Sequence, residues 1–251
     1  QLLEPIFQVG YVGGHDLNVP NEESTRVEFD EGNLLSLSRF PRPDRRERGL
    51  AAAYGVNWSR FDPAGWETRL TFGQVVRRND EPDYSETSGL SGTTSDFLLA
   101  AQWKTRNGLA LTGRTVFNEK FDVAKAELRG DWIGKRLTLG GSYVWLGEDA
   151  AEDRALAVSE LTLASSYDLN QSWTASANWR YDLVDDRAAY AGAGLTYNNE
   201  CVSARFSVSR RYTSSTSVEP STNLGFTVTL RGFSVSQGTE KYVRSCGKQA
   251  K

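Results

Sequence analysis

Residues 172–182, SWTASANWRYD, alternate apolar and polar side chains with a period of two. The odd-numbered positions are Trp, Ala or Tyr, whereas the even-numbered positions are Ser, Thr, Asn, Arg or Asp. Successive side chains of an extended strand point to opposite faces of its sheet. The stretch therefore predicts a β-strand with one apolar face and one charged face.

The same alternation recurs along the chain and predicts twelve strands. It is regular in 122–132, 201–211 and 222–231, and the polar positions of 122–132 are Lys, Glu, Arg and Asp. The remaining segments, which include the opening one, follow the rule less regularly: 2–12, 50–60, 66–76, 96–104, 109–117, 136–146, 155–167 and 188–197. No segment has a 3.6-residue apolar stripe long enough to indicate a helix instead.

The connections between these segments alternate in length. Tight turns are expected at 61–65, 105–108, 133–135, 168–171 and 198–200. The other connections, most of them longer, are 13–48, 77–94, 118–120, 147–153, 183–187 and 213–221. Short turns at one end and long loops at the other indicate an all-β fold, an antiparallel up-and-down transmembrane β-barrel. The segment lengths fit the roughly 9–11 residues that a tilted membrane strand needs.

A soluble β-sandwich or a ligand-binding barrel would also alternate. Two features weigh against both. Eleven contiguous, hairpin-linked strands exceed an ordinary sandwich, and charged residues recur on the polar face, as they would in a water-filled lumen. Six tryptophans are expected near tight turns, where aromatic side chains form interfacial girdles: Trp58, Trp66, Trp103, Trp132, Trp145 and Trp173.

The composition excludes several classes of function. A formal net charge of -3 argues against a basic nucleic-acid-binding domain, so no nucleic acid is expected as a partner. One histidine, His15, and two cysteines leave no His or Cys metal cluster and no Ser–His or Cys–His catalytic set. We therefore expect no catalytic residues, no metal and no cofactor. The chain opens on Gln1 and contains no Met, so we interpret it as a processed chain or a fragment.

Two stretches resemble the outer-membrane lipopolysaccharide-assembly family LptD, also called OstA. One is 20–56, with the core FDEGNL, and the other is 194–233. The resemblance implies a C-terminal portion, about twelve strands, of a larger barrel in the outer membrane of a Gram-negative cell. On this interpretation residues 1–232 belong to the barrel and 233–251 form a periplasmic C-terminal tail.

The resemblance also implies a function. Such a barrel, working with an LptE-like plug lipoprotein, receives lipopolysaccharide from periplasmic bridge proteins and inserts it into the outer leaflet through a lateral gate. The gate strand would be the last alternating segment, comprising Asn223, Leu224, Gly225, Phe226, Thr227, Val228, Thr229 and Leu230. The alternatives are another outer-membrane barrel, such as a porin or a secretion channel, and, less well supported, an outer-membrane hydrolase.

The segment 13–48 is the least strand-like part of the chain. By strand count it is an extracellular loop, which could simply be solvated. The resemblance implies instead a loop folded into the lumen, and its apolar centre favours that interpretation. The candidate residues are Asn21, Glu22, Phe29, Asp30, Asn33, Leu34, Arg39, Phe40, Asp44 and Arg45.

Cys201 and Cys246 are both expected at the periplasmic end, where the oxidising compartment favours disulfides. The resemblance implies long-range disulfides to a periplasmic domain, formed by an adjacent cysteine pair near this turn. Here Glu200 precedes Cys201, which departs from that pattern. A Cys201–Cys246 bridge and partners in sequence outside this chain both remain open.

Arginine substitutions should distinguish the two faces. Phe206→Arg or Leu224→Arg should destabilise the folded barrel by about 2–4 kcal/mol near the bilayer midplane, because the guanidinium would face lipid. Ser207→Arg should cost much less, since its face would border water. Folding titrations in lipid vesicles would measure both, and equal tolerance at the two faces would contradict the barrel.

Overall fold

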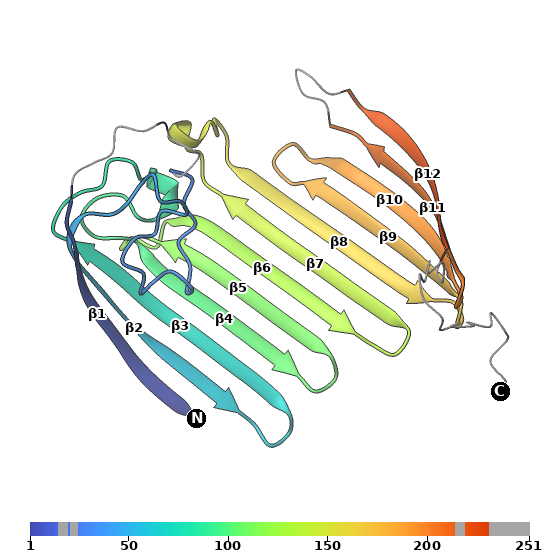
Figure 1. Cartoon of the computed structure of the whole chain (residues 1–251), viewed down its shortest axis with the longest axis horizontal. Coiled ribbons are helices and arrows are strands. Elements are labelled where there is room, and N and C mark those ends of the chain that lie inside the picture. The colour runs from blue at the N-terminus through green and yellow to red at the C-terminus, as the bar shows by residue number, and fades with distance from the viewer. Residues whose placement is uncertain (15–19, 21–24, 214–218, 231–251) are drawn as a thin grey trace, which may run out of the picture. The chain divides into compact units, whose positions relative to one another are not determined.

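The computed structural model describes residues 1–14, 20, 25–213 and 219–230. The described chain forms twelve β-strands and two three-residue 3-10 helices, and the strand order in the sheet is the chain order (Figure 1). The predicted all-β, antiparallel up-and-down fold is therefore confirmed. The strands are β1 (Leu2–Val12), β2 (Gly49–Phe61), β3 (Trp66–Arg77), β4 (Phe97–Thr105), β5 (Leu109–Phe117), β6 (Val123–Ile133), β7 (Leu137–Leu146), β8 (Val158–Asp168), β9 (Trp173–Asp182), β10 (Arg187–Asn198), β11 (Val202–Arg211) and β12 (Ser221–Leu230).

Most strand ends lie within a residue or two of their predicted positions, but β8 starts three residues late. Asp149 and Arg154 exchange backbone hydrogen bonds of 2.7 and 2.9 Å around the 3-10 helix η2 (Ala150–Glu152). This pairing folds the connection back on itself. Residues up to 157 are therefore kept out of the strand. The other 3-10 helix is η1 (Glu86–Ser88). No helix among the described residues is long and apolar enough to cross a membrane.

The chain divides into two compact units. The first comprises Gln1–Trp132, Gly140–Leu161 and Asp182–Asp185, within the described residues. The second comprises Ile133–Leu139, Thr162–Tyr181 and the described residues from 186 onward. The first unit contains β1 to nearly all of β6, and the second contains most of β9 and all of β10, β11 and β12.

The core of the first unit lies on the face of the sheet that also carries charged residues. Residues directly opposite in an antiparallel pair share a face, and the register places Leu98 opposite Val116, which lies opposite Lys125. We call this face the polar face. Its buried apolar residues contact side chains of two long connecting segments, 25–48 and 78–96. The joint cluster is Val27, Phe29, Leu34, Phe40, Ala53, Val75, Tyr84, Leu90, Leu98 and Val116. On the opposite, apolar face, Leu70, Phe72 and Leu99 are exposed.

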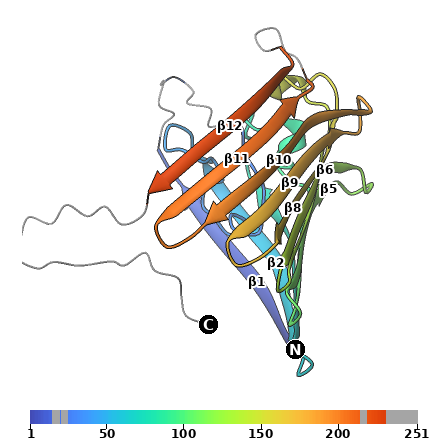
Figure 2. The ribbon, with the colours of Figure 1, turned by 90° about the vertical axis from the view of Figure 1, so that its right-hand side faces the viewer.

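The second unit keeps the predicted alternation without a covering loop among its described residues. On its polar face Ser207 lies opposite Gly194 and Gly225. On its apolar face Phe206 lies opposite Phe226, with ring centroids 4.6 Å apart. Figure 2 shows β9 to β12 following one another in a meander. Leu224 of β12 is 83% exposed, as expected for a side chain that faces lipid.

Five of the six tryptophans lie near tight turns, as predicted. They include Trp132, whose indole N–H donates to the carbonyl of Asn107 at 3.2 Å. Trp145 does not, because it is the penultimate residue of β7 and leads into the connection 147–157. The prediction was therefore wrong for Trp145, because this residue lies at the end of its strand that enters the longer connection, away from the tight turn at 133–135.

Asp96, the residue before β4, makes the first unit sensitive to pH. Burial raises the pKa of its carboxyl to about 6. The folded state therefore holds this proton more tightly than the unfolded chain, and stability should rise as pH falls from about 6 toward the ordinary value of 3.8.

Asp96→Asn should remove this dependence. At pH 7 the variant should gain on the order of 1 kcal/mol in unfolding free energy, because solvent screens the half-buried charge and reduces the full effect. Urea unfolding of the full-length protein at pH 7 and pH 4.5 would measure this. A variant no more stable than the parent at pH 7 would contradict the assignment.

Candidate functional site

The sequence FDEGNL, residues 29–34, forms a turn closed by its own side chains. The Asp30 carboxylate accepts backbone hydrogen bonds from Gly32 and Asn33, both at 2.9 Å, and the Asn33 amide oxygen accepts one from the Asp30 backbone at 3.1 Å. Asp and Asn favour turns because their short side chains can bond nearby backbone in this way. The turn presents Phe29 and Leu34 to the core, where both are fully buried.

Strand glycines let this segment lie close to the sheet. A Cβ on Gly73 of β3 would lie 3.0 Å from Cδ1 of Leu34, and one on Gly10 of β1 would collide with the side chain of Leu37. A larger residue at either position would push the segment away. The missing Cβ atoms of the two glycines therefore leave room for leucine side chains of the segment 25–48.

Ion pairs join the same segment to β5 and β6. Glu31 pairs with Arg114 through two hydrogen bonds of 2.9 and 3.1 Å, and Glu28 lies 3.4 Å from Lys125. Glu127 of β6 also pairs with both Arg114 and Lys125. Burial raises the pKa of Glu31, but the Arg114 hydrogen bond and charge outweigh it and leave the pKa below its ordinary value.

The charged residues of the polar face form ion pairs across strands only in part. Arg114 and Glu127 pair across strands, whereas Arg129 pairs with Asp131 two positions along the same strand, at 2.7 Å. The Asp182 carboxylate instead accepts hydrogen bonds from the backbone of Val184 and Asp185 in its own turn. Asp182 therefore closes a turn.

Glu47 is the centre of a buried polar cluster. Its two carboxylate oxygens accept hydrogen bonds from Nη1 of Arg39, both at 2.9 Å, and one of them also accepts from the Arg39 backbone N–H. The Tyr84 hydroxyl donates to the same carboxylate at 2.6 Å, and Arg77 Nη1 lies 3.5 Å from it. Arg39, Glu47 and Arg77 are 4%, 2% and 4% exposed. One carboxylate thus stands between two buried guanidinium groups.

This cluster ties three segments together. Phe40 stacks on Tyr84 at 4.5 Å between ring centroids, and the Arg77 guanidinium lies over the same ring. Arg77 also donates to the backbone carbonyls of Leu90 and Gly92. Burial and then the Glu47 charge raise the pKa of the Tyr84 phenol, which keeps it a hydrogen-bond donor. The segment 25–48, the end of β3 and the connection 78–96 therefore form one packed body.

Hydrogen bonds join the connection 147–157 to the packed body formed by the segments 25–48 and 78–96. The Asp149 carboxylate accepts from the backbone N–H and the hydroxyl of Thr87 at 3.0 and 2.6 Å, and Arg154 donates to the same hydroxyl at 2.6 Å. Burial raises the pKa of Asp149, but these hydrogen bonds, with one from Ala151, leave it below its ordinary value. Ser85 donates to Glu152 across the same contact.

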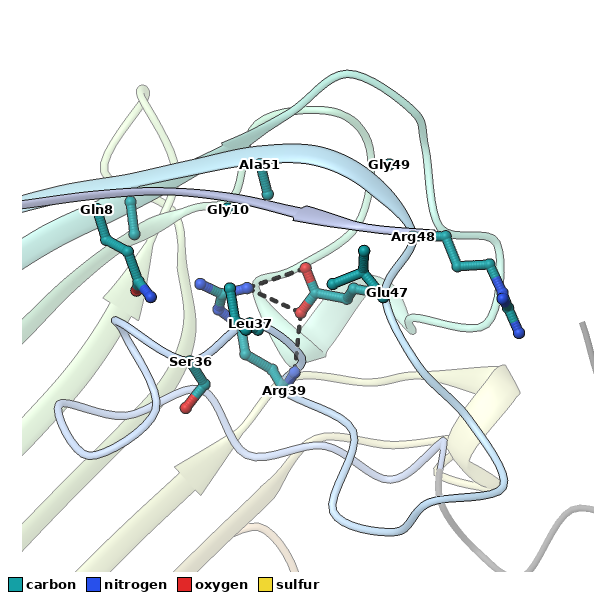
Figure 3. Close-up of a pocket in the computed structure, with 11 residues that line it drawn as sticks. Gln8, Gly10, Ser36, Leu37, Arg39, Glu47, Arg48, Gly49 and Ala51 are labelled. Carbon is teal, nitrogen blue, oxygen red and sulfur yellow. Dashed lines mark hydrogen bonds and ion pairs between the residues drawn. The ribbon is translucent and has the colours of Figure 1, made fainter. Parts of the chain in front are cut away.

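The pocket beside this cluster is too small for a ligand. Figure 3 shows Gln8, Ser36 and Leu37 around the Arg39–Glu47 pair, where a cavity of about 10 Å³ remains. That volume holds a single water molecule at most. No group of three or more His, Cys, Asp or Glu side chains that could hold a metal occurs in the described part of the chain. We call this packed body of loops, formed by the segments 25–48 and 78–96, the plug.

The predicted loop residues divide into four groups. Phe29, Leu34, Arg39 and Phe40 are buried in the plug. Asp30 and Asn33 close the turn. Arg45 pairs with Asp83 at 3.0 Å, and the Asp44 carbonyl accepts from Arg45. The last group, Asn21 and Glu22, lies outside the described residues. His15 and Cys246, which the sequence analysis also names, lie outside them as well.

Sequence reasoning missed Glu47, Arg77 and Tyr84. Glu47 stands in the run RRER at 45–48, which resembles a solvated charged surface. Its only signal is that a lone carboxylate interrupts a set of arginines. The partner residues lie 30 and 37 positions away along the chain, and nothing local pairs them with Glu47.

Cys201 lies in the turn between β10 and β11 and is disulfide-bonded. The Asn199 side chain accepts hydrogen bonds from the backbone N–H groups of Cys201 and Val202 at 2.9 and 2.6 Å, which fixes this turn. Because Cys246 lies outside the described residues, the connectivity stays a prediction.

Comparisons with known proteins agree with the resemblance to the LptD family that the sequence shows. The family model LptD, described as LPS transport system D, matches residues 1–173, which include 20–56 but not 194–233. An LPS-assembly protein LptD of Vibrio cholerae is 25% identical over 235 residues, covering 84% of this chain and 29% of the relative. An LPS-assembly protein LptD of Shewanella sp. strain ANA-3 is 27% identical over 218 residues, covering 82% and 28%. The chain thus spans under a third of their length.

Among solved structures, a mutant porin of Rh. blastica aligns with 72% of this chain and 81% of its own. The sequence identity is 12% and the TM-score is 0.39. A second mutant of the same porin, with a TM-score of 0.38, aligns over the same shares at 11% identity.

Removing the Glu47 charge should loosen the plug. Glu47→Gln leaves the Arg39 and Arg77 guanidiniums buried without a counter-charge, so it should lower the unfolding free energy by about 3–5 kcal/mol. Glu28→Gln removes a carboxylate whose side chain is 70% exposed and should cost under about 1 kcal/mol. Thermal unfolding of the full-length protein would compare the two. Similar losses would show that Glu47 is not the centre of the cluster.

Proposed function

Because the chain belongs to the LptD family and lies in the outer membrane, we propose that it forms the C-terminal part of a barrel wall that inserts lipopolysaccharide into the outer leaflet. The family match over residues 1–173 carries this proposal. The family is one of transport and assembly, and the proposed role requires no catalytic chemistry.

The two faces of the strands support this role. Exposed apolar side chains such as Phe72 and Leu224 would contact membrane lipid. The charged face, with Arg114 and Lys125, would line the lumen through which a polar headgroup passes. The plug of segments 25–48 and 78–96 packs on that face in the first unit. We propose that it narrows the lumen together with an LptE-like lipoprotein, and that periplasmic bridge proteins deliver the lipid.

The proposed lateral gate is β12. Among the described residues its hydrogen-bonding partner is β11. Pro220 precedes it and Gly225 lies within it, and both residue types weaken strand pairing. In a closed barrel the last strand must pair with the first. A weak seam there would let a lipid with a large polar head leave sideways.

A cross-link at this seam should stop transport. A disulfide that joins β12 to the first strand of the full-length barrel should prevent lipopolysaccharide from reaching the cell surface and should be lethal when oxidised. A disulfide that joins β12 to β11 should be harmless, because this pairing is part of the wall.

Surface labelling of lipopolysaccharide after oxidation would measure both variants. If the two cross-links behave alike, β12 is not the gate. If depletion of the full-length protein leaves surface lipopolysaccharide unchanged, the proposed function itself is wrong.

A further inference from the structure

The polar face of the second unit contains an open cleft. It has a volume of about 380 Å³, within the range of small-molecule sites. Its polar lining side chains come from β8, β9, β10, β11 and the segment that follows β11: Thr162, Asn178, Arg180, Tyr190, Arg211 and Thr213. No Asp or Glu is among the described residues that line it.

The strand register builds this cleft. Arg211 of β11 lies opposite Tyr190 of β10 and Ser221 of β12, so all three share the polar face. Gly192, two residues along from Tyr190, has no Cβ. A Cβ there would collide with the Asn178 amide oxygen and lie 3.1 Å from the Tyr190 hydroxyl. The glycine thus lets an amide and a phenol gather beside Arg211.

The charge balance differs from that of the first unit. There, Arg114 and Lys125 each pair with carboxylates of the loop and of β6. By contrast, β10, β11 and β12 contain no Asp or Glu. Arg205 of β11 lies opposite Thr196 and Thr227, which offer hydroxyls and no counter-charge. The part of the polar face formed by β10, β11 and β12 therefore presents cations among hydroxyl groups.

We propose that this cleft binds the phosphorylated sugar headgroup of lipopolysaccharide. The inference rests on the proposed function and assigns its ligand contacts. A guanidinium such as that of Arg211 matches a phosphate by paired, charge-assisted hydrogen bonds. The hydroxyls of Tyr190, Thr162 and Thr213 and the Asn178 amide can donate to and accept from sugar hydroxyls. The face continues across β11 to β12, the proposed gate strand.

Arg211 and Arg210 provide a matched pair of variants. They are neighbours in β11 and carry the same charge, but Arg210 lies on the apolar face, over the ring of Tyr212 at 5.3 Å. The full-length protein in detergent would be titrated with phosphorylated core-type lipopolysaccharide, with its dephosphorylated form and with inorganic phosphate.

Arg211→Gln should weaken binding of the phosphorylated glycolipid about tenfold or more, as expected when a charge-assisted hydrogen bond is lost. Arg210→Gln should change it less than about twofold, since its side chain does not face the cleft. Arg211→Lys should recover only part of the lost binding, because it keeps the positive charge but cannot form the paired hydrogen bonds of the guanidinium. The dephosphorylated form should bind the parent and Arg211→Gln equally. Heat-modifiable mobility on gels would confirm that each variant is folded.

Several outcomes would overturn the inference. Equal losses for Arg210→Gln and Arg211→Gln would indicate attraction by overall charge. Binding of inorganic phosphate that depends on Arg211, with glycolipid binding that does not, would indicate a free-anion site. If the parent binds and transports lipopolysaccharide and Arg211→Gln binds it as tightly, the cleft assignment fails while the proposed function stands. If the parent itself neither binds nor transports it, the proposed function fails.

Discussion

The buried Glu47 carboxylate, held between the guanidiniums of Arg39 and Arg77, is the interaction on which the first unit depends. Burying three charges is costly, and only close pairing with further hydrogen bonds offsets that cost. The cluster meets this requirement only when the segment 25–48, the end of β3 and the connection 78–96 are all in place. Its contribution is therefore to select one arrangement of the plug, more than to add net stability.

A second constraint acts on the strands, since each has a face toward lipid and a face toward water. In the first unit the water-side face is covered by loops. Leu37 packs against Gly10 and Leu34 against Gly73, so these loops contact the sheet directly. In the second unit the same face bears Arg205 and Arg211 among hydroxyls. The same alternating strand pattern thus carries a plug in the first unit and an open cationic surface in the second, because the residues at the polar positions differ.

The strands were predictable because their signal is local. Alternation in 172–182 or 201–211 needs no knowledge of distant residues, and the strand count and order were predicted correctly. Strand ends were predicted less accurately where pairing within a connection sets the first residue of the strand, as the Asp149–Arg154 pairing does before β8.

The site was predictable only in part. The buried apolar residues of the segment 25–48 stood out in an otherwise polar run, whereas Glu47 did not. Its role depends on Arg77 and Tyr84, which are brought to it by the fold. The cleft at Arg211 was equally hidden, because it needs the register of four strands and the missing Cβ of Gly192.

In the native membrane the segment 25–48 should pack on the polar face of the sheet. Cysteine pairs in the full-length protein would test it most directly with a short thiol cross-linker. Leu34→Cys with Val75→Cys should cross-link efficiently, because both side chains are fully buried in the same cluster on the polar face. Leu34→Cys with Phe72→Cys should not, because Phe72 lies on the opposite face of the same strand. Equal cross-linking of the two pairs, or cross-linking through Phe72 alone, would show that the segment does not pack on this face.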